Sequence, residues 1–185
     1  GLWMAGFESN HPIQGTHDDI WARVIVMKTG DVTVAVVSLD LVGFFNNHVR
    51  QVREKVKEKA KQHGFDYILI SATHGHEGPD SMGQWGVEEE GLPAKSGVNK
   101  EFFDSVLENT TKAIIEAADN MKKATMTAGT IRTGIEGFLR DSRDPQIFDD
   151  ELIALKFVEA GSDKIIATLV NWGNHPEALS DTNNY

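Results

Sequence analysis

An apolar run, VTVAVVSLDL at positions 32–41, constrains the fold more than any other feature of the sequence. Residues 34–37 are apolar on both faces of an extended chain, which is typical of a central strand covered on both sides. The run WARVIVM at 21–27 precedes it, and the connecting residues MKTGDV have the composition of a hairpin turn. The sequence therefore predicts two adjacent strands near its beginning.

A helix and a third strand follow this pair. Residues 47–62 carry apolar side chains at helical spacing, and Gly64 is suited to end that helix. The run DYILISA at 66–72 reads as the next strand. A strand, a helix and a strand in this order indicate a parallel pair joined by a right-handed crossover.

The rest of the chain extends the same fold class. Residues 77–98 are rich in glycine and predict a loop, which in compact domains is usually functional or disordered. A long helix is expected over 100–121, and a strand over 124–131. ELIALKFVE and KIIATLVNW then flank AGSD as a hairpin. The buried stripe of the long helix is predicted to be Phe103, Val106, Leu107, Ile114, Ala117 and Met121. The whole predicts one α/β domain with a mixed β-sheet and flanking helices.

Composition excludes several classes of protein. The net charge of −10 argues against a phosphate-binding surface, and hence against a nucleic-acid partner. The chain has no cysteine, so disulfides and thiolate zinc sites are excluded, and a metal would need His, Asp, Glu, Tyr or water. No apolar run is long enough to cross a membrane. The opening GLWMAGF does not begin with methionine and shows no signal peptide, and the sequence stops at SDTNNY shortly after an apolar run. We therefore expect a processed start and a missing C-terminal part.

Polar residues follow three of the predicted strands. Asp40 follows the strand at 33–39, His74 and His76 follow the one at 67–72, and His175 follows the one at 165–172. Sites in open α/β sheets collect at the carboxyl ends of strands, and residues two apart in an extended segment point to one side. We therefore expect His74 and His76 to face one cavity, with His175 joining them from another strand.

Other interpretations of these residues stay open. Asp40 could cap a turn, His175 could be a core histidine with one hydrogen bond, and a His-x-His pair alone is weak support for a metal. Zinc would suit the set, because it binds neutral imidazole and a catalytic site keeps one position open for water. The chain has no G-x-S-x-G, H-E-x-x-H or P-loop motif.

Five segments in order carry a resemblance to a known family. They are WMAGF, GTHDDIWARVIVM, VVSLDLVGF, ISATHGHEGPD and NWGNHPEAL. Together they resemble the N-terminal catalytic domain of the neutral/alkaline non-lysosomal ceramidases, over nearly the full chain. The most specific parts are the His-x-His-x-Gly-Pro segment and the later Asn-x-x-x-His-Pro segment.

The resemblance implies a zinc-dependent amide hydrolase acting on N-acyl-sphingosine or a related lipid amide through a metal-activated water. It implies that His74 and His175 are zinc ligands, that His76 lies by the scissile amide, and that Arg143, or less favourably Arg140, faces the substrate. A serine, a glutamate ligand and a tyrosine ligand would come from later sequence, so residues 1–185 are expected to be the truncated N-terminal part of a catalytic domain. Alone they should be inactive. The family also implies a periplasmic or secreted protein, with a substrate that can lie at a membrane surface.

The chain departs from the family at two positions. Gly75 and Glu77 stand where the family usually has threonine and serine, and Glu77 predicts a more polar pocket mouth than a long acyl chain favours. A non-catalytic binding or structural domain of the same fold is therefore an alternative. So is another His-ligated metallohydrolase that uses Asp40.

Four further histidines and one tryptophan have their own predictions. His17 could reach the site, but the aspartates beside it favour a turn. His11, His48 and His63 are predicted at the surface. Trp85 in the long loop could line a substrate entrance or cover the edge of the core.

Overall fold

The computed structural model describes residues 1–137 and 139–175, and these form two compact units. Within the described residues, the first unit spans Gly1–Met121 and the second spans Lys122–His175. The predicted mixed α/β class is confirmed, as three small sheets and two α-helices across this part of the chain. No helix in the described ranges is long and apolar enough to cross a membrane.

The first sheet contains β1 (Ala22–Thr29), β2 (Val32–Leu39) and β3 (Tyr67–Ala72), in that order. β1 and β2 form the predicted antiparallel hairpin, and Gly30 at its turn has a φ of +56°, which glycine adopts without strain. β2 and β3 pair in parallel, as the order of strand, helix and strand predicts.

Two helices cover one face of this sheet. α1 (Asn46–Lys59) ends three residues before the predicted boundary, and a short 3-10 turn (Lys61–His63) carries the chain to Gly64 in the left-handed conformation. α2 (Lys100–Asp119) is capped by Asn99, whose side-chain oxygen accepts a hydrogen bond from the Phe102 N–H at 2.9 Å. Such a cap satisfies one of the N–H groups that a helix start leaves unpaired.

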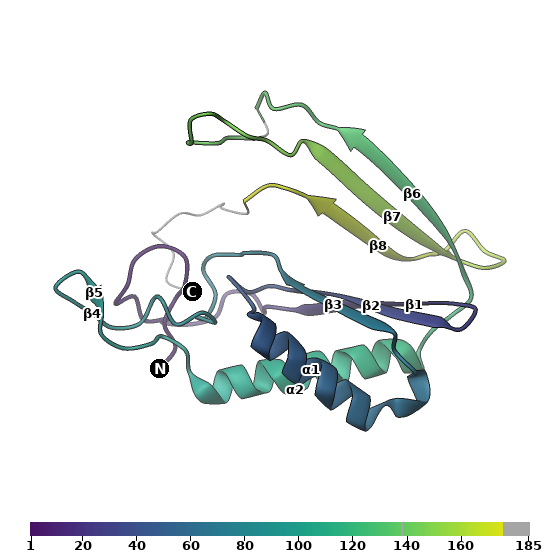
Figure 1. Ribbon diagram of the computed structural model, residues 1–185, viewed down its shortest axis with the longest axis horizontal. Helices are drawn as coiled ribbons and strands as arrows, with labels where there is room; N and C mark the ends of the chain where they lie inside the picture. The colour runs from purple at the N-terminus through teal and green to yellow at the C-terminus, as the bar shows by residue number, and fades with distance from the viewer. Residues whose placement is uncertain (138, 176–185) are drawn as a thin grey trace. The chain divides into compact units, whose positions relative to one another are not determined.

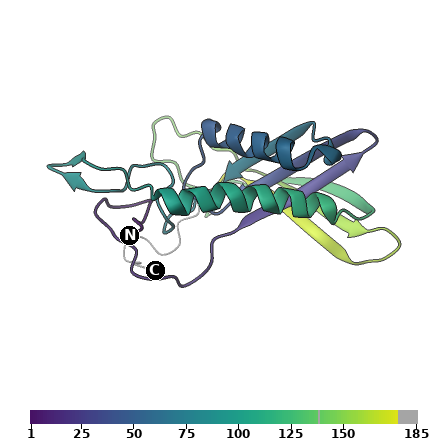
Figure 2. The same cartoon turned by 90° about the horizontal axis from the view of Figure 1, so that it is seen from below.

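The core of the first unit lies between the helices and the sheet. Figures 1 and 2 show α1 and α2 side by side on the same face. Thr33, Ala35, Val37 and Leu39 of β2 are buried, whereas Val32, Val34, Val36 and Ser38 between them are half-buried or exposed. The expectation that this run is buried on both faces is therefore wrong, because only alternate residues meet the helices. The side chains that fill the core include Ala35, Val37, Leu39, Val52, Val56, Leu107 and Ile114.

The predicted stripe of α2 is correct in its centre and wrong at its end. Phe103, Leu107 and Ile114 are buried, but Met121 is 38% exposed because it lies beyond the last turn of the helix. The buried face instead includes Thr110, Thr111 and Ala118. The Thr111 hydroxyl donates to the Leu107 carbonyl at 2.8 Å, and this satisfies the buried polar group within the helix.

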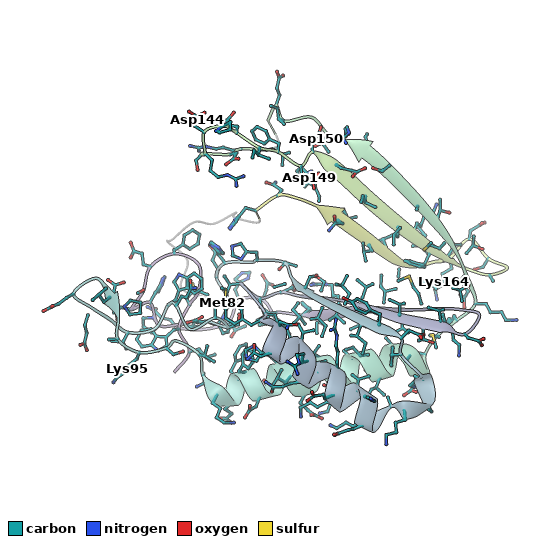
Figure 3. All side chains as sticks on the ribbon, in the orientation of Figure 1. Met82, Lys95, Asp144, Asp149, Asp150 and Lys164 are labelled. Atoms are coloured by element: carbon teal, nitrogen blue, oxygen red, sulfur yellow. The ribbon has the colours of Figure 1, made fainter. Side chains whose placement is uncertain are left out.

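The second unit is a three-stranded antiparallel sheet of β6 (Ala124–Arg132), β7 (Glu151–Glu159) and β8 (Ile165–Trp172), in that order (Figure 1). The predicted β7–β8 hairpin is confirmed, with one irregularity in register between Phe157 and Val158. Asp149 and Asp150 immediately precede β7 (Figure 3).

The long loop of the first unit has structure that its composition does not predict. Two short strands, β4 (Glu88–Glu89) and β5 (Leu92–Pro93), form a small antiparallel hairpin within residues 77–98. Glu90 and Gly91 both have positive φ at its turn.

Candidate active site

His74 lies just beyond β3 and its ring is fixed by the main chain. Its Nδ1 lies 2.6 Å from the carbonyl oxygen of Val42. A carbonyl only accepts, so Nδ1 carries the proton and Nε2 carries the lone pair of the neutral ring. Val42 and its neighbour Leu41 are 2% and 3% exposed, so this carbonyl belongs to a buried segment that follows β2. A metal-binding histidine typically has this arrangement, with one nitrogen oriented by a backbone carbonyl.

His76 is half-buried and its ring contacts that of His74. The ring centroids are 5.1 Å apart, with the planes at 76°. The two rings lie together, whereas the expectation that both face one cavity stays a prediction, and the extended segment on which it was based is wrong. His74 has a φ of +59° and Glu77 a φ of +70°, so the chain bends at the histidine pair and does not continue as an extended strand. Positive φ at residues other than glycine is strained, and such strain is concentrated at functional sites.

The first residues of the chain also reach His76, which sequence reasoning missed. The Phe7 ring stands edge-on to the imidazole, with centroids 4.9 Å apart and an interplanar angle of 83°. Gly6 has a φ of +117°, and a Cβ placed there would lie 2.3 Å from Cγ of His76. The glycine of WMAGF was the only signal in the sequence, and no spacing rule links it to residue 76.

Asp40 is engaged in the sheet. Its Oδ2 accepts hydrogen bonds from Nη1 of Arg23 at 2.5 Å and from the Trp21 N–H at 3.1 Å. The Arg23 guanidinium also lies 5.9 Å from the centroid of the Trp21 ring. These contacts join Asp40 to Trp21 and Arg23 at the start of β1, so its turn-capping role and its role as a metal ligand both stay predictions.

In the second unit, Arg143 forms a two-pronged ion pair with Asp141. Nε of Arg143 donates to Oδ1 at 2.8 Å and to Oδ2 at 3.0 Å, while Nη2 donates to Oδ2 at 2.7 Å. The Ile147 N–H donates to the same carboxylate at 2.9 Å. The Arg143 hydrogen bond holds the pKa of Asp141 far below its usual range, and the backbone donors Ile147 and Arg143 lower it further. The same pair raises the pKa of Arg143.

His175 and Arg143 line one hollow of about 360 Å³ within the second unit. Arg140, the less favoured candidate, and Asp149 lie on it too. His175 is exposed. Its role as a second zinc ligand stays a prediction, and residues 176–179 of its NWGNHPEAL segment lie outside the described residues.

The remaining histidines divide into exposed and packed ones. The His17 side chain is 81% exposed and its Nδ1 lies 2.8 Å from Asp18, in agreement with the turn interpretation. The prediction of a surface position is wrong for His11, His48 and His63, which are all half-buried. His63 contacts Asp119 at 2.7 Å with its side chain 14% exposed, and His48 packs against Phe103 with ring centroids 4.4 Å apart.

The loop after His76 is organised by a buried carboxylate, Asp80, which is 1% exposed. Its Oδ1 accepts from the N–H groups of Met82 and Gly83, at 2.8 and 2.7 Å. Its Oδ2 accepts from the Trp85 N–H at 3.0 Å, so the Trp85 backbone is part of this anchor. The sequence patterns predicted no role for Asp80.

Comparison with known proteins gives a consistent result. A family model described as neutral/alkaline non-lysosomal ceramidase, N-terminal, matches residues 1–185. A solved structure described as a ceramidase complexed with C2 is similar, with a TM-score of 0.74, 18% identity and coverage of 99% of this chain. The neutral ceramidase of Pseudomonas aeruginosa is similar too, with a TM-score of 0.72, 20% identity and 99% coverage.

At these identities the two solved structures establish a shared fold. The chain spans 30% and 31% of their respective lengths. No curated protein matches the sequence. The family match covers every residue of the chain, including both histidine segments. The chain therefore belongs to the neutral/alkaline non-lysosomal ceramidase family, through the N-terminal region of that family.

Proposed function

We propose that the intact protein is a zinc-dependent amide hydrolase that cleaves N-acyl-sphingosine or a related lipid amide. The observation that carries the proposal is the hydrogen bond from Nδ1 of His74 to the Val42 carbonyl at 2.6 Å. It fixes the tautomer in which Nε2 presents a lone pair, as a zinc ligand requires. Family membership supports the hydrolase class.

His74 and His175 are the residues of this chain that we propose as zinc ligands. Zinc, when bound, would polarise the amide carbonyl and lower the pKa of a water molecule toward neutrality. The residues present fit this ion, because both offer imidazole and the chain offers no competing thiolate. The family resemblance implies a glutamate and a tyrosine as the other ligands, from sequence beyond residues 1–185.

His76 and Arg143 are the proposed catalytic residues. His76, held next to His74, would hydrogen-bond the reacting amide and stabilise its leaving group. Arg143 uses Nε and Nη2 on Asp141, so its Nη1 group would donate to the substrate. Glu77 adds a charge beside His76, so the part of the substrate that meets it is proposed to be polar.

The setting of the reaction is part of the same proposal. A lipid amide is poorly soluble, so the substrate would be presented at a membrane surface. We propose a periplasmic or secreted location on the basis of family resemblance alone. The rest of the catalytic domain would be supplied by later residues of the same protein.

Elemental analysis of the intact protein tests the metal proposal directly. We expect about one zinc ion per chain, and loss of zinc in both His74→Ala and His175→Ala. His17→Ala is the matched control, because the His17 side chain is 81% exposed and pairs with the neighbouring Asp18. Zinc that both histidine variants retain would contradict the ligand assignment.

A substrate screen then tests the reaction. The wild-type protein and His76→Gln are given N-acyl-sphingosines with short and long acyl chains, and release of the fatty acid is measured. Hydrolysis by the wild type and its loss in His76→Gln are expected. Absence of both zinc and hydrolysis would favour the alternative, a binding or structural domain that kept the fold.

A further inference from the structure

The first residues of the chain form a short ladder with the turn that carries His76. The Ala5 N–H donates to the Gly78 carbonyl at 2.8 Å, and the Glu77 N–H donates back to the Ala5 carbonyl at 3.0 Å. The Asp80 N–H donates to the Trp3 carbonyl at 2.8 Å. These bonds fix the register of two segments that lie more than seventy positions apart in the sequence.

The other edge of this segment is held as well. The Met4 N–H donates to the His11 carbonyl at 2.8 Å, and the Ile13 N–H donates to the Leu2 carbonyl at 2.9 Å. Met4 and Ala5 are 2% and 1% exposed. The segment is thus anchored on both edges and buried in its middle, which leaves little freedom to the residues that follow.

Those next residues meet the His76 ring. A Cβ built on Gly6 would lie 2.3 Å from Cγ, 2.4 Å from Cβ and 2.6 Å from Nδ1 of His76. Real Cβ atoms do not approach so closely, and the φ of +117° is one that L-residues rarely adopt. The centroid of the Phe7 ring then lies 4.9 Å from the centroid of the His76 ring. Gly6, Phe7 and His74 therefore surround the imidazole.

We propose that residues 3–7 are a strap that sets the orientation of the His76 imidazole, with Gly6 and Phe7 as positioning residues for it. The inference rests on the proposed function for its meaning, since orientation matters only if His76 meets the substrate. Preorganisation of a reacting group by neighbours that lock its rotamer is a general requirement of catalytic sites. Gly6 supplies the space for the ring, and Phe7 closes it on one side.

The test uses the intact protein with 13Cε1-labelled histidine and three variants. Gly6→Ala places a methyl group where the ring lies, and Phe7→Leu removes the aromatic edge but keeps an apolar side chain. Gly30→Ala is the matched control, because Gly30 also has a positive φ and its Cβ would meet nothing within 4 Å. The His76 signal is assigned by its loss in His76→Gln.

We expect the His76 signal to move in Gly6→Ala and, by less, in Phe7→Leu, and to stay in place in Gly30→Ala. Because a misplaced catalytic group is expected to lower the rate about 100-fold, kcat should fall to that extent in Gly6→Ala while zinc content is unchanged. A His76 signal at its wild-type position in a folded Gly6→Ala protein would overturn the strap.

If Gly6→Ala does not fold, Phe7→Leu tests whether residues 3–7 orient the His76 ring. An unmoved His76 signal in Phe7→Leu then overturns the proposal, and a moved one supports it. Failure of the proposed function is seen separately, as a wild-type protein without zinc or hydrolysis. The ring signal reports on the strap in either case.

Discussion

Two loops of this protein are each built around an aspartate, one in each unit. Asp80 in the first unit is 1% exposed and accepts hydrogen bonds from the backbone N–H groups of Met82, Gly83 and Trp85. Asp141 in the second unit accepts the Arg143 guanidinium as well as backbone N–H groups. The first carboxylate shapes a loop, whereas the second also holds a cation in place.

The two carboxylates also differ in how closely the chain encloses them and their partners. A Cβ on Gly97 would lie 2.3 Å from Oδ2 of Asp80, so the chain closes directly over this carboxylate. Arg143, in contrast, is 70% exposed and lines an open hollow. Removal of Asp80 should therefore lower the stability of the protein, and removal of Asp141 should release the Arg143 side chain from its fixed orientation.

Asp80→Ala should have the largest effect. Three N–H groups lose their acceptor in a place closed to solvent, and each buried unsatisfied group costs about 1–3 kcal/mol, so we expect a loss of about 3 kcal/mol or more. The free energy of unfolding, from urea denaturation of the intact protein, measures it. Asp104→Ala, on the exposed face of α2, is the control and should change the free energy by less than about 0.5 kcal/mol. A loss below 1 kcal/mol in Asp80→Ala would show that solvent or another group replaces the carboxylate.

Asp141→Asn should change activity more than stability. The amide cannot hold the guanidinium with two charge-assisted hydrogen bonds, so Arg143 loses its fixed orientation. We expect kcat/KM for amide hydrolysis to fall about 10- to 100-fold, as for other misplaced groups, with zinc content unchanged. Arg143→Lys should behave similarly, because an ammonium has no fork to pair with the carboxylate.

The ion pair also predicts a dependence on pH. The folded-state pKa of Asp141 is lowered by Arg143, so the stabilisation by the pair is complete above the usual aspartate pKa of about 4 and is lost as the pH falls below it. The difference in the free energy of unfolding between wild type and Asp141→Asn should therefore become smaller as the pH falls below about 4. An unchanged difference at low pH would exclude the ion pair as the cause.

His48 should give the smallest effect, and it extends the comparison from carboxylates to a half-buried base. Its ring packs against Phe44 and Phe103, and burial lowers its pKa. Because the folded state resists protonation, stability should decrease as the pH falls through the unfolded-state pKa of about 6.5. His48→Phe should reduce this decrease between pH 7 and 5 in thermal melts, and the exposed control His17→Phe should not. Equal acid sensitivity in wild type and His48→Phe would contradict the assignment.

Much of the fold could be predicted because local patterns and the tertiary structure agree. The turn at Gly30, the parallel pairing of β2 and β3, and the β7–β8 hairpin all follow from periodicity and from turn residues. Element ends were less predictable. α1 ends at Lys59, before its expected boundary, because a 3-10 turn replaces the last α-helical residues.

The sequence by itself determined most of the strands, the two α-helices of the described residues and the pairing of His74 with His76, because side-chain periodicity and histidine spacing are local properties of the chain. It could not show which face of the apolar run in β2 is buried, since Val34 and Val36 are as apolar as Val37. Only the tertiary structure decided that His74 is oriented by the Val42 carbonyl, that Gly6 and Phe7 meet His76, and that Asp141 holds Arg143. The first two of these contacts join residues far apart in the sequence, and the third depends on the conformation of a loop. No rule of sequence spacing predicts these three contacts, because they depend on where the backbone lies once the core has formed.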